Sequence, residues 1–272
     1  MQRSALAVSR HSTVDYGILQ CVGHFRNAIN LLTPGQQLLT LHREGRGLSP
    51  MGWEIADDDF DDISDELAQS ARCELTPQGI VLAEMCLCLP ERRTDLHLSR
   101  TGQIATAPLE VVLAAAPAET GLFGRLDRIV SQPADAEIRL MQQLFSDWLQ
   151  GEFVDWSRVL GKGPGLTPGN DDTVLGMLLC AWFDRRIDVT RRPAFFAASR
   201  PLDELTTLIS VNYLRFAAQG IFATPLQRFA AALSGERPLS AAVSELQEIG
   251  HSSGTDTLLG IWSGARVINR LY

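Results

Sequence analysis

The sequence predicts an α+β protein in which a small β-rich N-terminal domain, barrel-like or sandwich-like, precedes a mainly helical C-terminal domain. Two observations carry this prediction. Short apolar runs separated by turn residues fill residues 15–105, and segments of helical length and spacing follow from about residue 106. With 272 residues, 45% of them hydrophobic, the chain is long enough for a substantial buried core. We therefore expect domains at residues 1–105 and 106–272, with the boundary near residues 100–108.

The N-terminal part contains several predicted strands. Residues 28–32 and 38–42 are apolar and flank a turn at 33–37, which is typical of strand, turn and strand. Further strands are expected at 79–89 and 97–104. Cys86 and Cys88 alternate with Leu87, so both thiols lie on one face of a strand, where free cysteines usually act as small core residues. The five cysteines lack the spacing of a disulfide framework or zinc site.

An acidic run at residues 57–66 interrupts these strands. It lacks the glycine and the spaced ligands of a calcium-binding loop. We expect a solvated acidic segment around a short helix, with Phe60 and Ile63 at helical spacing and facing inward.

Overall charge and the N-terminal residues exclude several classes of protein. The net charge of −8 and the pI near 5.2 argue against non-specific nucleic-acid binding, which depends on dense Lys and Arg surfaces. The first apolar stretch is too short for a signal peptide, and no segment approaches eighteen consecutive apolar residues. We expect a cytoplasmic protein that binds neither nucleic acid nor membranes.

The second half of the chain is predicted to be helical because its apolar residues recur at helical spacing. The expected helices are residues 109–116, 122–130, 134–149, 172–184, 202–222, 225–233, 240–249 and 256–270.

A glycine-rich loop at residues 161–173 dominates this helical half. Four glycines among residues 161–169 allow positive φ angles and close approach to a ligand. Asp171, Asp172 and Thr173 are residue types that cap helices, and an apolar helix follows them. Free N–H groups and the helix dipole make such a loop and helix N-terminus an anion-binding arrangement.

A second copy of this arrangement occurs near the C-terminus. Residues 172–176 and 256–260 both read Asp-Thr-x-Leu-Gly, and a loop of small residues precedes each. Our hypothesis is that the two helices pack side by side and that their N-termini converge on one ligand.

The acidic residues of the two loops allow two interpretations. Asp171, Asp172 and Asp256 either cap the helices, a role worth roughly 0.5–2 kcal/mol each, or hold a divalent ion such as Mg²⁺ that grips a phosphate. Residues 250–254 match G-x-S-x-G, but a helical segment precedes them and no histidine follows, so the context of a serine hydrolase is missing.

Other polar residues complete the predicted site. His251 lies in a polar loop and is a candidate for proton transfer. Lys162 and Arg215 are the cationic candidates for a bound anion, Arg215 because the helix around it is otherwise apolar and a buried arginine needs an anionic partner. Asn212 lies on the same helix face, three residues before Arg215.

These motifs resemble the DUF2877 family, and most closely its AllH type. The resemblance rests on residues 163–168 (Gly-Pro-Gly-Leu-Thr-Pro), on Asp171 and Asp172, on residues 250–256 and on residues 28–31 (Ala-Ile-Asn-Leu). It implies a subunit of oxamate carbamoyltransferase, acting in anaerobic allantoin degradation, where oxalurate and phosphate are converted to oxamate and carbamoyl phosphate. It also implies partner subunits of the AllF and AllG types. Gly169 and Asn170 stand where a Ser-Gly or similar small polar pair is common in the family.

The expected site combines both loops, and the family's catalytic residues are not among the residues carried over by the resemblance. His251 and Asp172 are the catalytic candidates, and Asp171, Asp172 and Asp256 the candidate ligands of an ion. Two alternatives stay open: a structural or regulatory subunit without catalysis, and an anion-binding protein with another ligand. The residues expected to bind substrate are Lys162, Gly163, Gly165, Thr167, Asn170, Asp171, Thr173, Asn212, Arg215, Ser252, Ser253, Gly254 and Asp256.

Overall fold

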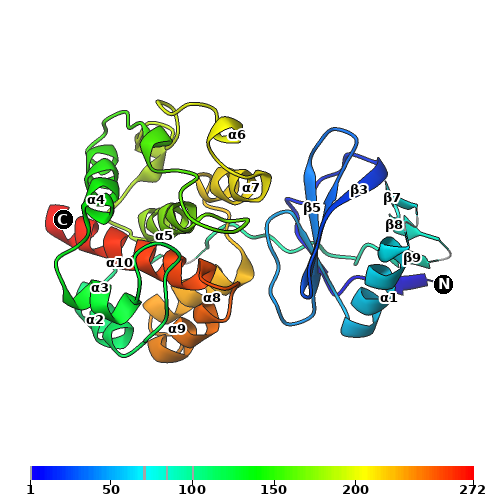
Figure 1. The fold of residues 1–272 in the computed structure, drawn as a ribbon, viewed down its shortest axis with the longest axis horizontal. Coiled ribbons are helices and arrows are strands. Elements are labelled where there is room, and N and C mark those ends of the chain that lie inside the picture. Colours follow the sequence, from blue (N-terminus) through cyan, green and yellow to red (C-terminus); the bar gives the residue numbers. More distant parts are fainter. Residues whose placement is uncertain (1, 70–71, 84, 100) are drawn as a thin grey trace. The chain divides into compact units, whose positions relative to one another are not determined.

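The computed structural model describes residues 2–69, 72–83, 85–99 and 101–272. The chain forms two compact units, Met1–Leu96 and His97–Tyr272 (Figure 1). The first is built on a β-sheet and the second on helices, which confirms the predicted α+β class. Arg100, within the expected boundary region, lies outside the described residues.

One mixed sheet organises the N-terminal unit. Its described strands follow the order β1-β9-β8-β7-β3-β4-β5-β6-β2. Neighbours are antiparallel except for the pairs β1–β9 and β5–β6. The strands are β1 (Gln2–Ser4), β2 (Ala7–Val8), β3 (Gly17–His24), β4 (Ala28–Leu32), β5 (Leu38–Arg43), β6 (Gly52–Ile55), β7 (Cys73–Thr76), β8 (Gly79–Leu82) and β9 (Met85–Cys88).

The predicted strand pair at 28–32 and 38–42 is confirmed as the hairpin β4–β5. The segment 79–89 is a hairpin of β8 and β9, in which Ala83 has a φ of 44°. The sulfur atoms of Cys86 and Cys88 lie 3.8 Å apart on one face of β9, as the alternation predicts. All five cysteines are free.

The acidic run forms helix α1 (Asp57–Ala68), which covers part of the sheet core. Phe60 and Ile63 are buried, as predicted. Arg43 forms ion pairs with Asp57 and Asp61, and its guanidinium lies 4.4 Å from the centre of the Phe60 ring. Two carboxylates of α1, those of Asp57 and Asp61, are therefore bound to arginine.

The expected strand at residues 97–104 is wrong for the described part of this segment. It makes isolated bridges only, between His97 and Ile221 and between Gly102 and Asp184. The backbone N–H of Leu98 donates to Gly220, and that of Gly102 donates to Phe183. Its backbone hydrogen bonds thus go to residues near helix ends, which offer no continuous strand to pair with.

Helices make up most of the C-terminal unit, and α5 and α10 lie side by side at its centre (Figure 1). Nearly every side chain of α5 is buried. The helices are α2 (Thr106–Ala114), α3 (Leu126–Ser131), α4 (Ala136–Leu149), α5 (Gly169–Phe183), α6 (Leu202–Leu205), α7 (Leu208–Ala217), α8 (Thr224–Leu233), α9 (Leu239–Gln247) and α10 (Ser253–Leu271), with short 3₁₀ turns at Trp156–Arg158 and Val189–Arg191.

The single helix expected at 202–222 is in fact two helices, α6 and α7. Thr206 between them is extended, with φ −149° and ψ −177°. Thr207 caps α7 by accepting a hydrogen bond from the N–H of Ser210. Threonine hydroxyls compete with helix continuation by bonding elsewhere, which explains the break.

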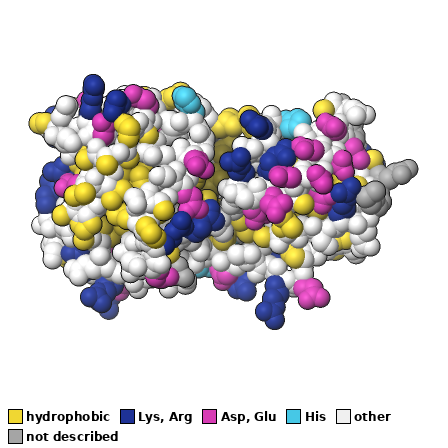
Figure 2. Space-filling model, turned by 90° about the horizontal axis from the view of Figure 1, so that it is seen from below, with side chains coloured by type: hydrophobic (Ala, Val, Ile, Leu, Met, Phe, Trp, Pro, Cys, Tyr) yellow, Lys and Arg dark blue, Asp and Glu magenta, His cyan; other side chains and the backbone are white. Residues whose placement is uncertain are grey.

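Charged side chains of both signs are interspersed on the surface that Figure 2 presents, with no broad basic area. Within the residues that the structure describes, each helix falls short of the length or the apolar character needed to cross a lipid bilayer.

Candidate functional site at the N-termini of two central helices

The two copies of the Asp-Thr-x-Leu-Gly motif meet where α5 and α10 pack together. A Cβ atom at Gly176 would lie 2.2 Å from the carbonyl oxygen of Thr257, and one at Gly260 would lie 1.9 Å from the carbonyl oxygen of Thr173. Further along, a Cβ at Gly264 would contact Cys180. The contacts advance in the same direction on both helices, so α5 and α10 run parallel and their N-termini lie at the same end. The predicted side-by-side packing is confirmed.

Asp172 and Asp256 occupy equivalent buried positions at this end. Each is the fourth residue of its helix, and their exposed fractions are 5% and 0%. Both carboxylate oxygens of Asp256 accept a hydrogen bond from the N–H of Gly121, at 2.9 and 3.1 Å. Oδ2 of Asp172 is buried and has no hydrogen-bond partner. A buried carboxylate oxygen without a donor is rare in folded proteins and indicates a missing ligand or proton.

Hydroxyl groups from both loops lie next to Asp172. The side-chain oxygens of Thr167 and Ser253 are 2.7 Å apart, which joins the glycine-rich loop to the start of α10. Burial raises the pKa of Asp172 well above its usual value, and the charges of Asp256 and Asp171 raise it further, whereas the two hydroxyls oppose the shift. Asp172 is therefore a buried carboxyl group that readily holds a proton.

The pKa of Asp256 is also raised by burial, against the opposing hydrogen bonds from Gly121 and Ser252. A Cβ atom at Gly121 would lie 3.0 Å from Asp256 Oδ2 and 3.1 Å from Ser252 Oγ, and a Cβ at Gly169 would lie 3.1 Å from the same carboxylate oxygen. Glycine at these two positions therefore leaves space around the Asp256 carboxylate.

Asp171 has a different role, because it holds loops together. Its Oδ1 accepts the N–H of Gly161 at 2.7 Å, and its Oδ2 accepts the hydroxyl of Thr206. Burial raises the pKa of Asp171, while hydrogen bonds from Thr206, Gly161 and Ser210 lower it. Both oxygens are thus used within the protein, at the junction of α6 and α7.

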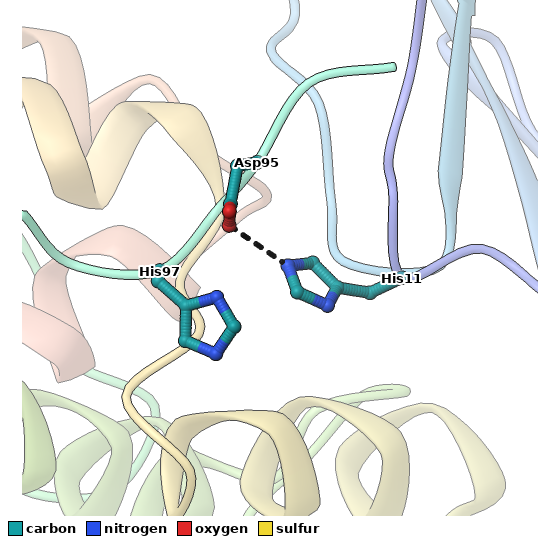
Figure 3. A group of neighbouring side chains, drawn as sticks. All are labelled: His11, Asp95 and His97. Atoms are coloured by element: carbon teal, nitrogen blue, oxygen red, sulfur yellow. Dashed lines mark hydrogen bonds and ion pairs between the residues drawn. The ribbon is translucent and has the colours of Figure 1, made fainter.

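The geometry restricts where a divalent ion could bind. In the described chain, Asp171, Asp172 and Asp256 do not each place an oxygen within 4.8 Å of the others, so they are not the ligands of one ion together. Asp172 and Asp256, with the hydroxyls of Thr167 and Ser253, are the hard oxygen donors that fit Mg²⁺. In the N-terminal unit, Asp95 is paired instead: its Oδ1 lies 3.3 Å from Nε2 of His11 (Figure 3) and its Oδ2 lies 3.0 Å from Arg10.

Lys162 and Asn170 both bind Glu137 of α4. Oε1 of Glu137 lies 2.7 Å from Lys162 Nζ and 2.8 Å from Asn170 Nδ2. Asn170 Nδ2 also donates to the carbonyl of Val159 at 2.9 Å, and its Oδ1 is buried without a partner. Lys162 is half-exposed, so its charge is partly neutralised by Glu137 at the side of the glycine-rich loop.

The glycines of the loop have distinct functions. Gly163 has a φ of 119°, and a Cβ there would lie 2.5 Å from the backbone nitrogen of Gly169, so only glycine lets the loop cross the start of α5. Gly165 has a φ of 92° and faces open space. The hydroxyl of Thr173 donates to the Gly169 carbonyl at 2.9 Å and stabilises the first turn of α5.

Some N–H groups at the two N-termini are already used. The N–H of Asn170 donates to Lys162, and that of Gly254 donates to Ile249 at 3.1 Å. Gly254 therefore serves packing, since a Cβ there would lie 1.6 Å from the carbonyl oxygen of Leu246. Within the described chain, the N–H groups of Gly169 and Ser253, the first residue of each helix, have no protein acceptor. These two donors remain for a ligand.

Arg215 and Asn212 have partners outside the two loops, and His251 is exposed. Arg215 is exposed and pairs with Asp203 at 2.6 Å, which corrects the expectation that it is buried and needs an anionic ligand. Asn212 donates to the carbonyl of Leu208, one turn earlier in its own helix. His251 is exposed in the turn before Ser252, the N-cap of α10.

The sequence did not single out four residues that shape the site: Gly121, Glu137, Thr206 and Thr207. Gly121 donates to Asp256, and Glu137 fixes Lys162 and Asn170. The hydroxyl of Thr207 donates to the carbonyl of Leu166 and so holds the glycine-rich loop. The pair Thr206-Thr207 inside an apolar helical pattern was the one signal that could have indicated these contacts.

Two family models match the chain. The model described as oxamate carbamoyltransferase subunit AllH covers residues 159–265, which include both copies of the motif. The model described as the AllH family N-terminal domain covers residues 9–99. No solved structure matches the chain.

Proposed function

Because the chain belongs to the AllH family, we propose that it works as a subunit of an oxamate carbamoyltransferase and binds the small anionic substrate where α5 and α10 begin. The reaction interconverts oxalurate plus phosphate with oxamate plus carbamoyl phosphate. All four compounds are small anions, the class of ligand that paired helix N-termini bind best.

One observation carries this proposal: Asp172 Oδ2 is buried, has no partner, and lies beside a second buried carboxyl group, Asp256. Carboxyl groups with raised pKa values cluster at sites of proton transfer. Helix capping does not account for Asp172, because as the fourth residue of α5 it lies beyond the cap position.

The chemistry follows from these positions. In the direction that forms oxalurate, the nitrogen of oxamate attacks the carbamoyl carbon, the bond from that carbon to the phosphate oxygen breaks, and the nitrogen loses a proton. Asp172 would accept this proton as a general base. The N–H groups of Gly169 and Ser253 and the hydroxyl of Thr167 would orient the anion and stabilise the developing charge.

A divalent ion, if bound here, would neutralise part of the negative charge of the phosphate group. In that case Asp172 would be a ligand of the ion rather than the base, together with Asp256 and the hydroxyls of Thr167 and Ser253. Lys162, whose charge Glu137 partly neutralises, would add a cation at the side of the loop. His251, exposed near the start of α10, is a second candidate for proton transfer.

The proposed enzyme contains further subunits, of the AllF and AllG types, so the test uses the reconstituted complex. Replacing Asp172 with Asn should lower kcat by about a hundredfold or more, the usual contribution of a general base. Asp203→Asn is the matched control, because Asp203 is exposed and pairs with Arg215 outside the site. His251→Asn tells whether His251 contributes as well.

Full activity of the Asp172→Asn complex would contradict the proposal. It would place the chemistry on another subunit and leave this chain a structural or regulatory role, or the binding of an anion unrelated to the reaction.

A further inference from the structure

A small pocket lies at the opposite end of α5 from Asp172. Its volume is about 280 Å³, and its walls include Trp148, Leu178, Trp182, Arg192, Phe195 and Ala218. Ten residues separate Asp172 from Trp182, so roughly 15 Å of helix divides the two places. The pocket is therefore not part of the site at the helix N-termini.

Two buried hydrogen-bond donors of this wall have no partner. The indole N–H of Trp182 and Nε of Arg192 are both buried and unpaired. By contrast, the indole N–H of Trp148 in the same wall donates to the carbonyl of Pro193 at 2.9 Å. Unpaired buried donors are uncommon, and two in one pocket indicate an acceptor that binds there.

Arg192 gives the pocket its charge. It is the one charged residue among the described lining residues, and within the described chain it forms no salt bridge. Its Nη2 donates to the hydroxyl of Tyr272 at 3.0 Å, which is a neutral partner. Nearby Asp188 has a lowered pKa chiefly because Thr190 donates to it, and Arg192 adds only a small electrostatic contribution.

The rest of the wall is aromatic and rigid. The rings of Trp148 and Phe195 meet edge to face with centroids 4.8 Å apart, and Trp156 stacks on Phe195 with centroids 4.7 Å apart. A Cβ at Gly220 would lie 3.0 Å from the indole of Trp182, so the backbone holds that ring in place. Such walls favour a flat apolar body.

We propose that this pocket is a second ligand site, which binds a small carboxylate with a planar apolar body, the class of aromatic acids. The carboxylate accepts hydrogen bonds from Arg192 Nε and the Trp182 indole N–H, and the ring lies among Trp148, Leu178 and Phe195. Charge-assisted hydrogen bonds of this kind give the acid its preference over a neutral amide of the same shape.

Benzoate is the probe, titrated into the full-length chain and followed by calorimetry and tryptophan fluorescence, with benzamide and acetate for comparison. We expect saturable binding of benzoate and weaker binding of the other two. Arg192→Gln should weaken benzoate binding about tenfold or more, because the hydrogen bond to a charged group is lost. Trp182→Phe keeps the ring, removes the N–H, and should weaken binding severalfold.

Arg191→Gln is the matched control, since Arg191 is exposed, pairs with Asp188 and does not line the pocket. Asp172→Asn should also leave benzoate binding unchanged, which separates this proposal from the proposed function. Unchanged thermal midpoints would show that the variants fold. Absence of saturable benzoate binding, or equal affinity in wild type and Arg192→Gln, would overturn the proposal.

Discussion

Gly260 of α10 lies against the carbonyl group of Thr173 in α5, so closely that a Cβ atom at residue 260 would fall 1.9 Å from that oxygen. The equivalent glycine of α5, Gly176, has the same relation to Thr257. This reciprocal contact holds the two helix N-termini next to each other. The position of Asp172 beside Asp256 depends on it.

Gly260→Ala should therefore destabilise the protein by about 1–3 kcal/mol, the usual effect of overpacking against a backbone that cannot move away. Gly264→Ala on the same helix is the control, because its Cβ would lie 3.1 Å from the Cys180 side chain and 3.3 Å from the Met177 Cα atom, much less close than the contact at residue 260. Urea unfolding of both variants measures the difference. Equal losses of unfolding free energy in the two variants would show that α5 and α10 move apart to accommodate the new Cβ atom.

Asp172→Asn should make the isolated chain more stable at neutral pH. Burial raises the pKa of Asp172 in the folded state, so the folded chain binds more protons than the unfolded chain between the two pKa values, and stability falls as the pH rises through that window. An asparagine side chain does not titrate, so the variant lacks this decrease of stability with rising pH. The difference between variant and wild type should vanish below about pH 4, near the unfolded pKa of aspartate.

Asp127→Asn should have the opposite sign. The hydrogen bond and charge of Arg125 lower the pKa of Asp127 in the folded state, so its carboxylate contributes stability above the unfolded pKa, and that contribution is lost as the pH falls through the folded value. Unfolding midpoints measured from about pH 2.5 to about pH 8, a range that includes the unfolded pKa of aspartate at about 3.9, check both signs. The same sign for both variants would contradict this assignment.

His42 should make the N-terminal unit less stable in mild acid. Burial lowers the pKa of His42 to about 4, and its Nε2 lies 2.7 Å from Ser49 Oγ. The unfolded chain binds a proton at His42 near pH 6.5, whereas the folded chain binds it only near pH 4. The free energy of unfolding therefore decreases as the pH is lowered from about 6.5 to about 4. The decrease is at most about 3 kcal/mol, because the ring is partly accessible. Urea unfolding of His42→Gln should lack this dependence.

Thr206→Val should loosen the junction that holds Asp171. The variant removes a hydroxyl donor from a buried carboxylate, and hydrogen bonds to charged groups contribute about 1.5–3 kcal/mol. Because Ser210 and Gly161 still donate, we expect a loss near the lower value. Thr190→Val is the control, since Thr190 donates to the exposed Asp188. Equal effects in denaturant unfolding would mean that the Thr206 contact adds nothing.

Sequence reasoning located the central helix pair because its signal is local. The repeat Asp-Thr-x-Leu-Gly contains the acids of the site and also the glycines that permit close packing. The two short segments were therefore sufficient to predict that the helices contact each other. The hairpin β4–β5 and the inward face of α1 were predictable for the same reason, since turn residues and spacing lie within a few positions.

The remaining features depend on contacts between distant residues. Gly121 binds Asp256 across 135 positions, and Glu137 binds Asn170 across 33, and neither residue type is unusual where it stands. Arg215 was misread because an arginine in an apolar helix can face outward to an acid, here Asp203, as easily as inward. The 97–104 segment was misread because its described backbone groups bond to residues near helix ends instead of to a neighbouring strand.

Ligand-induced stabilisation of the isolated chain tests the central claim most directly. Thermal unfolding is compared with and without carbamoyl phosphate, oxamate, oxalurate or phosphate, each with and without Mg²⁺. A ligand at about one hundred times its Kd stabilises the folded state by roughly 2.7 kcal/mol. We predict a higher midpoint for wild type and Asp203→Asn with carbamoyl phosphate or oxalurate, and no ligand-induced shift for Asp172→Asn. The same shift in Asp172→Asn as in wild type, or none in any variant even with the partner subunits present, would contradict a substrate site at the N-termini of α5 and α10.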